Sequence, residues 1–169
     1  MTAILTSALL LAQQEPGQAE ADPRNPGDMG NLGTIMRTML GFGLADLALV
    51  SPAADVFDPR AVRSSMGALF ALRCEYFGSF EEYTARYSRN LYPFITDAEA
   101  KLGDIAFQEP FSLVFGNESS GLPSEFRRIG TGVSIANTRH IDSLNLPVAV
   151  AIGLYEATRG NLRTRETPS

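Results

Sequence analysis

Short segments rich in apolar residues recur along the chain and alternate with stretches of helical periodicity. Segments of about four to eight residues, bounded by Gly, Pro or polar residues, are typical of buried β-strands. Six such segments predict strands: Ala8–Ala12, Leu47–Val50, Leu72–Phe77, Leu91–Thr96, Phe111–Phe115 and Gly132–Ile135.

The clearest helical pattern covers residues 31–43, where apolar residues recur at spacings of three and four and share one helical face. Asn31 is placed to cap the amino end of this helix, and Gly41 and Gly43 can end it. The apolar positions are Leu32, Ile35, Met36, Met39 and Leu40.

Two shorter helices are predicted from their start signals. Asp58 followed by Pro59 is typical of an N-cap and a first-turn proline, and opens a helix to about Met66. Ser79 and Glu82 form a capping box that opens a second helix to about residue 87. Each of these helices follows a predicted strand.

A longer helix is predicted over Leu146–Arg159, and the residues after Gly160 are polar. Helices that alternate with nearly continuous apolar strands predict an α/β fold, a mostly parallel sheet flanked by helices. We expect one domain over residues 1–160 and a loose polar tail over 161–169. Sheets of this kind bind ligands at the carboxyl ends of their strands.

The composition narrows the class of protein. The chain has 169 residues, of which 44% are hydrophobic and 20% charged, so it is not an intrinsically disordered chain. Its single cysteine, Cys74, cannot form an internal disulfide, and no set of metal ligands is present, so no metal is expected. The apolar residues 2–12 lack the basic residues of a signal peptide, and no run reaches the ~18 apolar residues of a membrane span. We therefore expect a cytoplasmic protein that does not enter membranes.

The net charge of −5 argues against a nucleic-acid binder, because phosphate contacts normally come from a basic patch. Every basic residue except Lys101 is, however, an arginine, whose planar fork suits phosphate groups and base edges. A genome rich in Arg and Ala codons would explain the same bias, so the arginines do not decide the matter.

Three polar loops carry the candidate chemistry, and the first leads into the helix of residues 31–43. Asn31 and Arg37 lie six residues apart, so at 100° per residue they need not share one helical face. A capping Asn and a solvated Arg would explain the pair without a function.

The second loop, residues 116–123, follows a strand of the buried type. Gly116 and Gly121 have the spacing of a phosphate-binding loop, but Leu122 and Pro123 stand where that motif requires Lys and Ser or Thr, which excludes it. Glu118 is either a functional carboxylate or the cap of a short helix after the proline.

The third loop, residues 136–145, leads into the last helix. Ser143 or Asn145 could cap that helix. His140 is a candidate for a catalytic base. The sequence places no carboxylate or nucleophile beside it, however, so an ordinary loop histidine is favoured.

Together the three loops resemble the three signature motifs of the SpoU/TrmH branch of the SPOUT methyltransferases. The first motif of the family has Asn followed six residues later by Arg, the second reads Gly-x-Glu-x-x-Gly-Leu, and the third has Ser-Leu-Asn before an Ala/Val-rich helix. The resemblance extends from the strand at Ala8 to Arg159. The matching residues are Asn31 and Arg37, then Gly116, Glu118, Gly121 and Leu122, then Ser143, Leu144 and Asn145.

Two segments depart from the family pattern. Ile135-Ala136-Asn137 stands where the family often has Ile-Pro-Met, so backbone contacts can be kept there without the rigidity of proline. Residues 14–22 look like an insertion between the first strand and the first motif.

The resemblance implies a C-terminal trefoil knot, a homodimer, S-adenosylmethionine as the methyl donor and a ribose 2′-hydroxyl of RNA as the acceptor. Compact members of the family are known for tRNA, so tRNA is the first choice of substrate and ribosomal RNA the second. The residues expected to bind the cofactor are Ile95, Thr96, Gly116, Asn117, Ile135 and Leu144. The catalytic candidates are Arg37, Asn31, Glu118, Ser143 and Asn145.

The resemblance also suggests individual roles. The family's usual candidate for the base matches Arg37, but a guanidinium resists deprotonation, so we expect Arg37 to hold an RNA phosphate. Arg37 and Asn31 are expected to act across the dimer interface, while Glu118, Ser143 and Asn145 orient the hydroxyl. His140 and Asp142 are secondary candidates for the base. Glycine at position 116 is interpreted as letting the backbone approach the adenosine.

Two other classes of protein share some of these features. A nicotinamide or flavin enzyme could share the α/β layering, but no Gly-x-Gly-x-x-Gly turn follows the first strand. A member of the family that binds RNA without catalysis, or an interaction module, fits the acidic charge and the altered residues 135–137. The presence of Arg37, Glu118, Ser143 and Asn145 favours an active enzyme.

Overall fold

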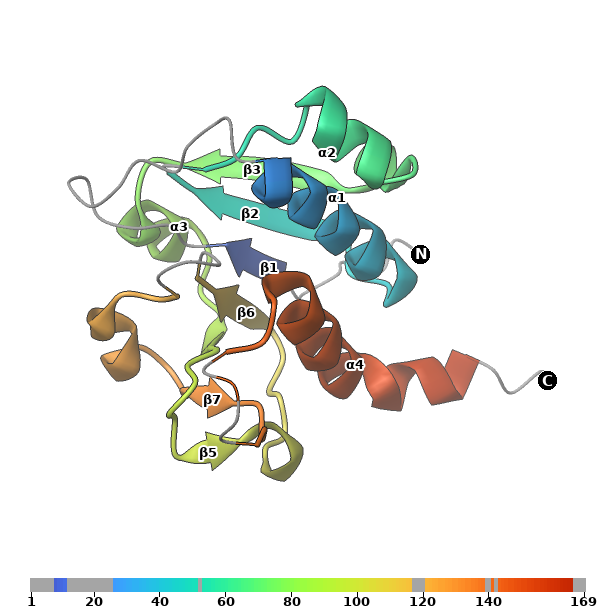
Figure 1. The fold of residues 1–169 in the computed structure, drawn as a ribbon. Helices are drawn as coiled ribbons and strands as arrows, with labels where there is room; N and C mark the ends of the chain where they lie inside the picture. Colours follow the sequence, from blue (N-terminus) through green and yellow to red (C-terminus); the bar gives the residue numbers. More distant parts are fainter. Residues whose placement is uncertain are drawn as a thin grey trace.

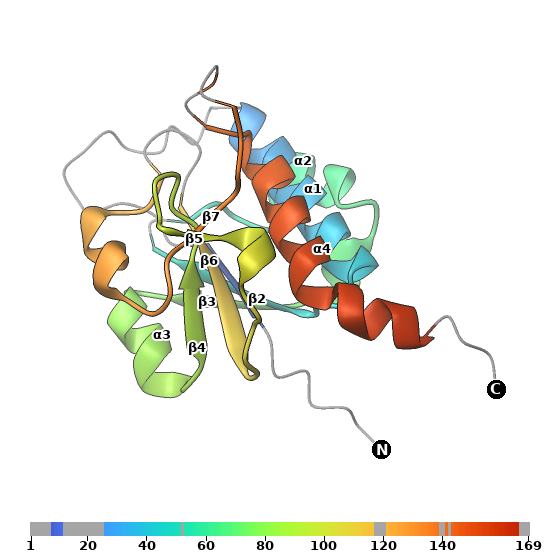
Figure 2. The same ribbon diagram turned by 90° about the horizontal axis from the view of Figure 1, so that it is seen from below.

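The computed structural model describes residues 8–11, 26–51, 53–116, 121–138, 141 and 143–165, and for residues 8–11, 26–29 and 161–165 it describes the backbone alone. Over these ranges the chain is an α/β protein whose five-stranded sheet carries helices on both faces (Figure 1). Helices α1 (Pro26–Gly41), α2 (Pro59–Ser64) and α4 (Leu146–Arg165) lie on one face, and α3 (Phe80–Arg86) lies on the other (Figure 2). The predicted fold class is confirmed.

The strand order in the main sheet is β3-β2-β1-β6-β4, and every neighbouring pair is parallel. A second, two-stranded parallel sheet pairs β5 with β7. Five of the six predicted strands belong to the main sheet and the sixth is β7, whereas β5 has only two residues and no apolar run that would predict it. The strands are β1 (Ala8–Leu11), β2 (Asp46–Val50), β3 (Arg73–Phe77), β4 (Asn90–Pro93), β5 (Ala100–Lys101), β6 (Phe111–Phe115) and β7 (Val133–Ser134).

Two predicted helix boundaries are wrong. Helix α1 begins at Pro26, so Asn31 lies inside it and is not its N-cap. Proline is favoured in the first turn of a helix, and Pro26 supplies this start signal. Helix α4 continues through Gly160 to Arg165, because one interior glycine costs a helix only about 1 kcal/mol. Three short 3₁₀ helices complete the fold: η1 (Ala68–Ala71), η2 (Leu102–Asp104) and η3 (Ser124–Arg128).

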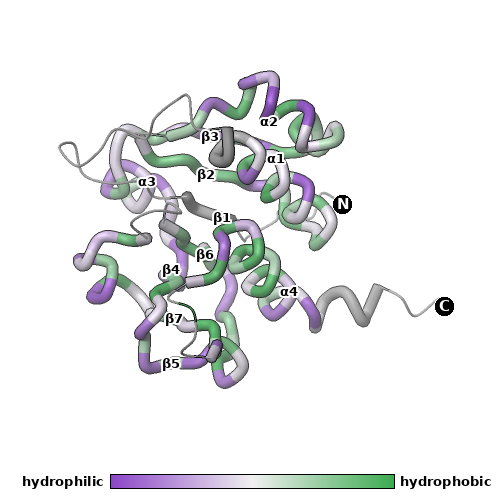
Figure 3. The backbone as a smooth tube through the Cα atoms, in the orientation of Figure 1, coloured by the Kyte–Doolittle hydropathy of each residue, from purple (hydrophilic) through white to green (hydrophobic). Residues whose placement is uncertain are grey.

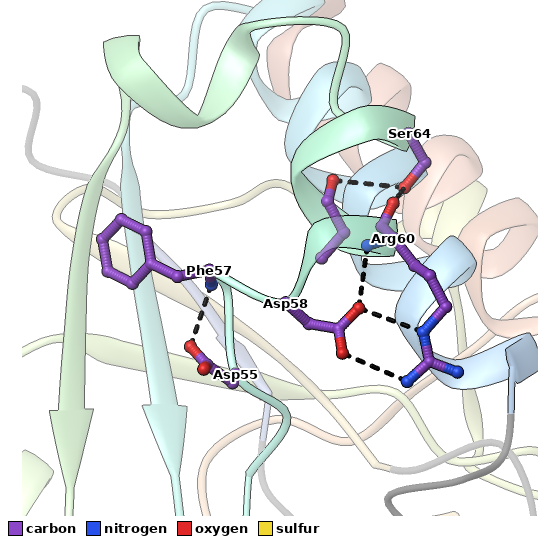
Figure 4. A network of polar contacts seen from close by, with 6 residues as sticks. Asp55, Phe57, Asp58, Arg60 and Ser64 are labelled. Carbon is purple, nitrogen blue, oxygen red and sulfur yellow. Dashed lines mark hydrogen bonds and ion pairs between the residues drawn. The ribbon is translucent and has the colours of Figure 1, made fainter.

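Both predicted capping signals are confirmed. The Asp58 carboxylate accepts a hydrogen bond from the Arg60 backbone N–H at 2.8 Å and pairs with the Arg60 guanidinium (Figure 4). The Ser79 hydroxyl accepts a bond from the Glu82 N–H at 3.2 Å, and the Glu82 carboxylate accepts one from the Gly78 N–H at 2.7 Å. Side chains thus satisfy amide groups at the start of α2 and at the entry to α3.

The core occupies both faces of the sheet, and the strands form its apolar centre (Figure 3). On one face α1 buries four of its five predicted apolar residues, whereas Leu40 is 42% exposed. Helices α1 and α2 approach closely because Gly33 has no side chain: a β-carbon there would lie 2.6 Å from the Ala61 carbonyl oxygen and would overlap the Ser64 hydroxyl. No helix among the described residues is both long and apolar enough to cross a membrane.

Candidate functional site

Three of the predicted cofactor-binding segments run side by side at the carboxyl edge of the main sheet. Strand β4 pairs with β6 in a register that aligns Pro93 with Val114, and the Phe94 N–H donates to the Val114 carbonyl at 2.8 Å. The next amide, that of Ile95, donates instead to the Val133 carbonyl of β7 at 2.9 Å. The chain at Phe94–Ile95 therefore joins the two sheets. It lies between the strand that leads to Gly116 and the strand that leads to Ile135.

The loop after Ile95 is fixed from two sides. The Ser134 hydroxyl is buried and donates to the Ala98 carbonyl at 2.9 Å, and the Lys101 ammonium donates to the same hydroxyl at 2.9 Å. Asp97 pairs with Arg127 of η3 at 2.7 Å, and the hydrogen bond from this guanidinium lowers the pKa of the carboxyl. Sequence reasoning missed both contacts, because each joins residues about 30 positions apart.

Gly116 is required by the chain itself. A β-carbon at this position would overlap the backbone of Gly121 and Leu122, so the loop returns directly against the end of β6. Gly121 has φ of +68°, a left-handed conformation that favours glycine. The fold itself thus requires glycine at position 116. The approach of adenosine to Gly116 stays a prediction.

The third motif leads into α4 at the same end of the molecule. Leu144 is half-buried between exposed Ser143 and Asn145, and the Asn145 carbonyl accepts the first bonds of α4, from Val148 and Ala149. Asn145 therefore stands at the cap position, one of the two alternatives that the sequence left open.

Helix α4 packs on the strand ends through a glycine. The rings of Phe94 and Phe115 stack with centroids 4.2 Å apart. A β-carbon at Gly153 would lie 2.7 Å from the Phe94 ring and 3.1 Å from the Phe115 ring. This contact fixes α4 over the point where β4 leaves the main sheet.

The two residues of the first motif lie at different positions along α1. Helix α1 returns the chain from β1 to the parallel strand β2, so it runs from the carboxyl edge to the amino edge of the sheet. Arg37 is eleven residues past Pro26, about 16 Å along the helix axis, and its side chain is exposed. Asn31 is half-buried near the start of the helix. Within the described residues of one copy, Arg37 thus lies well along α1 from the edge where Ile95, Gly116 and Leu144 are found.

Four of the sequence-based candidates lie outside the described residues: Asn117, Glu118, His140 and Asp142. What the described part of the site offers is a mixed surface. Ile95, Ile135 and Leu144 are half-buried apolar side chains, and Thr96, Ser143 and Asn145 are exposed polar ones. Such a combination suits a ligand with a flat apolar ring and polar edges.

A cavity of about 320 Å³ opens at the other end of β4, beside Asn90, Gln108 and Thr131. Its lining includes none of the predicted site residues and no carboxylate, histidine, lysine or arginine. It therefore offers no group for the chemistry considered above.

Comparison with known proteins identifies similar chains. Residues 24–155 match the SpoU rRNA Methylase family. The 23S rRNA (uridine(2479)-2′-O)-methyltransferase of Streptomyces viridochromogenes is 34% identical over 154 residues, which cover 85% of this chain and 54% of that protein. The chain spans about half the length of the curated relatives it matches.

Two solved structures share the fold closely. One, described as "Structural insights into the 2-OH methylation of C/U34 on tRNA", has a TM-score of 0.77 at 27% identity and covers 93% of this chain and 97% of that one. The SpoU methyltransferase AviRb from Streptomyces viridochromogenes, in complex with the cofactor AdoMet, has a TM-score of 0.74 at 29% identity, with 93% and 60% covered.

Proposed function

The chain belongs to the SpoU rRNA Methylase family, and from this membership we propose that it methylates a ribose 2′-hydroxyl of RNA with S-adenosylmethionine as the donor. The resemblance read from the three loops is thereby confirmed. The observation that carries the proposal is the meeting of Ile95, the end of β6 and the end of β7 at one edge of the sheet. The name of the 34% identical Streptomyces relative gives the same reaction, on 23S rRNA.

The residues at this edge fit the proposed cofactor. When bound, S-adenosylmethionine supplies a methyl group that is open to nucleophilic attack. Half-buried Ile95, Ile135 and Leu144 provide apolar contact for a purine ring, and Thr96 and Asn117 complete the proposed polar set. Gly116 keeps the backbone of the second loop against the sheet end, so the position of this loop depends on it even before a ligand is considered.

The acceptor hydroxyl must be held in line with the methyl group while its proton is removed. We assign the orientation of this hydroxyl to Glu118, Ser143 and Asn145, whose side chains donate and accept hydrogen bonds. Arg37 is assigned to an RNA phosphate, because a guanidinium does not release its proton readily. His140 and Asp142 stay secondary candidates for the base.

We propose that the active form is a homodimer, because the described residues of one copy leave large apolar side chains exposed and leave Arg37 without an ion pair. Leu40, Val148 and Tyr155 are 42%, 47% and 51% exposed and lie on the neighbouring helices α1 and α4. A second copy would bury them. In this arrangement Arg37 and Asn31 of one copy complete the site of the other.

The proposed substrate is tRNA, with ribosomal RNA as the alternative. A solved structure with a TM-score of 0.77 to this chain is described as concerned with methylation of C/U34 on tRNA, which supports the first choice. The 34% identical Streptomyces relative is named for 23S rRNA, which supports the alternative. A cytoplasmic location and a C-terminal trefoil knot are parts of the same proposal.

One experiment tests the reaction. Labelled methyl groups are transferred from S-adenosylmethionine to tRNA or ribosomal RNA, and the modified nucleotide is then replaced by its 2′-deoxy counterpart. We expect incorporation to disappear on the deoxy substrate. Incorporation that persists would identify a base as the acceptor. RNA binding without any transfer would instead support a non-catalytic member of the family.

A further inference from the structure

Two exposed arginines on helices α1 and α2 have no partner for their side chains among the described residues. Within the part of the chain that the structure describes, the guanidinium groups of Arg37 and Arg63 form no ion pair and no hydrogen bond. Most other arginines with described side chains are paired with carboxylates: Arg60, Arg73, Arg86, Arg127 and Arg159. An exposed, unpaired guanidinium is available to a phosphate group.

The fold places these two arginines on two helices in close contact. Helices α1 and α2 pack side by side, with Gly33 directly against Ser64 (Figure 1). Arg63 precedes Ser64 in α2, and Arg37 lies one helical turn beyond Gly33 in α1. Because the close contact fixes the two helices, the spacing between the cations does not depend on a mobile loop.

The turn that follows α2 carries two exposed apolar side chains. Met66 has φ of +50° and Gly67 has φ of +88°, so two successive residues adopt the left-handed conformation. Met66 is 74% exposed and Phe70 is 81% exposed, the highest values among the large apolar side chains of the described residues. A non-glycine residue with positive φ is uncommon and is found disproportionately at functional sites.

Phe70 is exposed on a fixed element. Its neighbours Ala68 and Leu69 are buried, and η1 packs against α1. The Ala68 N–H donates to the Ser65 carbonyl at 2.9 Å, and Ser65 is itself fully buried. The ring is therefore held in solvent by a backbone that cannot easily fold it back into the core.

We propose that Arg37, Arg63, Met66 and Phe70 form an RNA-binding surface, on which the arginines bind phosphates and Phe70 stacks on an unpaired base. The inference rests on the proposed function, because it takes RNA as the substrate. An exposed aromatic ring beside unpaired cations is the combination that single-stranded RNA requires. The Asp58 carboxylate at the start of α2 is paired with Arg60 (Figure 4), so it does not offset the charge of Arg63. Arg37 and Arg63 thus offer positive charge on a protein whose net charge is −5.

The test measures binding of labelled tRNA to the full chain over a range of salt concentrations. We expect Arg63→Gln to weaken binding about fivefold and to reduce the slope of log K against log salt by about 0.7 to 0.9, the loss of one phosphate contact. Phe70→Ala is expected to weaken binding about tenfold without a change of slope, because stacking releases no counterion. Phe70→Leu, which keeps apolar bulk without a ring, should also bind more weakly.

Arg128→Gln is the matched control. Arg128 is a third exposed arginine without an ion pair among the described residues, but it lies on η3, outside the α1–α2 surface. This variant should bind tRNA as the unmodified protein does, and every variant should bind S-adenosylhomocysteine normally, which also reports correct folding.

Several results would overturn the inference. If the unmodified protein binds and methylates RNA while Arg63→Gln and both Phe70 variants behave like it, the surface is not used and the proposed function stands. If the unmodified protein neither binds nor methylates tRNA or ribosomal RNA, the proposed function itself fails. If the variants instead lower the molar mass seen by light scattering and leave the salt slope unchanged, the surface is an interface between protein chains.

Discussion

No β-carbon fits at Gly116, because the backbone of Gly121 already occupies that position. The end of β6 is therefore in direct contact with Gly121 and Leu122, which also belong to the second motif. We expect Gly116→Ala to push this loop away, which lowers the free energy of unfolding by about 1 to 3 kcal/mol, the usual cost of overpacking. Affinity for S-adenosylhomocysteine should fall in parallel, as measured by calorimetry and thermal unfolding.

Gly103→Ala is the control, since a β-carbon at Gly103 meets nothing within 4 Å. This variant should change neither the free energy of unfolding nor the affinity for S-adenosylhomocysteine appreciably. If Gly116→Ala lost cofactor binding while its unfolding temperature stayed normal, the new methyl group would be blocking the ligand directly, and the structural reason given for this glycine would be wrong.

A pair of glycines in α1 offers a second matched comparison. Gly33→Ala should destabilise the protein by about 1 to 3 kcal/mol, because its methyl group would overlap Ser64 of α2. Gly30→Ala has open space around it and should instead stabilise the helix by up to about 1 kcal/mol. Chemical denaturation of both variants measures the difference. Equal effects would mean that α1 and α2 are not in close contact.

The buried hydroxyls of Tyr83 and Ser112 lie 2.5 Å apart and link α3 to β6. Ser112→Ala leaves the tyrosine hydroxyl without this partner, and we expect a loss of about 1 to 3 kcal/mol. Tyr83→Phe should cost a similar amount, while the double variant should cost less than the sum of the two. A double-mutant cycle with strictly additive losses would show that the two hydroxyls do not interact.

Arg37→Ala should abolish methyl transfer and leave cofactor affinity unchanged, because Arg37 is assigned to the phosphate beside the reacting ribose. Mixing this variant with Ser143→Ala tests the proposed sharing of the site. If each site takes Arg37 from the other copy, randomly mixed dimers should recover about a quarter of the normal activity. No recovery, in mixtures shown to exchange subunits, would place Arg37 and Ser143 in the same copy's site.

The ion pair between Asp97 and Arg127 should be visible in a pH titration. Hydrogen bonding from Arg127 lowers the pKa of Asp97 below its ordinary value of 3.8. The pair therefore contributes to stability above the unfolded-state pKa and loses that contribution as the pH falls through the lowered value. We expect the carboxyl resonance in NMR to titrate below pH 3.8 and to return to ordinary behaviour in Arg127→Ala. An unshifted titration in the unmodified protein would show that the ion pair does not form in solution.

The strands were predictable because each is a short apolar segment between turn residues, and α2 and α3 because Asp58 and Ser79 carry recognisable capping signals. The start of α1 was misplaced because Asn31 resembles a cap, whereas Pro26 opens the helix. The shift of the chain from β6 at Phe94 to β7 at Ile95 depends on contacts between distant residues, so no local pattern encodes it.

Some features of the candidate site could likewise be predicted from the sequence, and others could not. Residue types at fixed spacing indicated Gly116, Ser143 and Asn145, because these motifs are local in the sequence. The contacts that hold the loops, such as Asp97 with Arg127, join segments that only the folded chain brings together. Stacking of Phe94 on Phe115 and its fit against Gly153 were likewise beyond a reading of one sequence.

The bond from the Ile95 amide to the Val133 carbonyl also sets when the site can exist during synthesis. A ribosome that has released only the first 120 or so residues has made β1, β2, β3, β4 and β6, yet the amide of Ile95 still lacks its acceptor. The edge of the sheet to which we assign the cofactor is therefore completed only after β7 has emerged and docked. A nascent chain interrupted before β7 can form most of the main sheet without acquiring the means to hold the methyl donor.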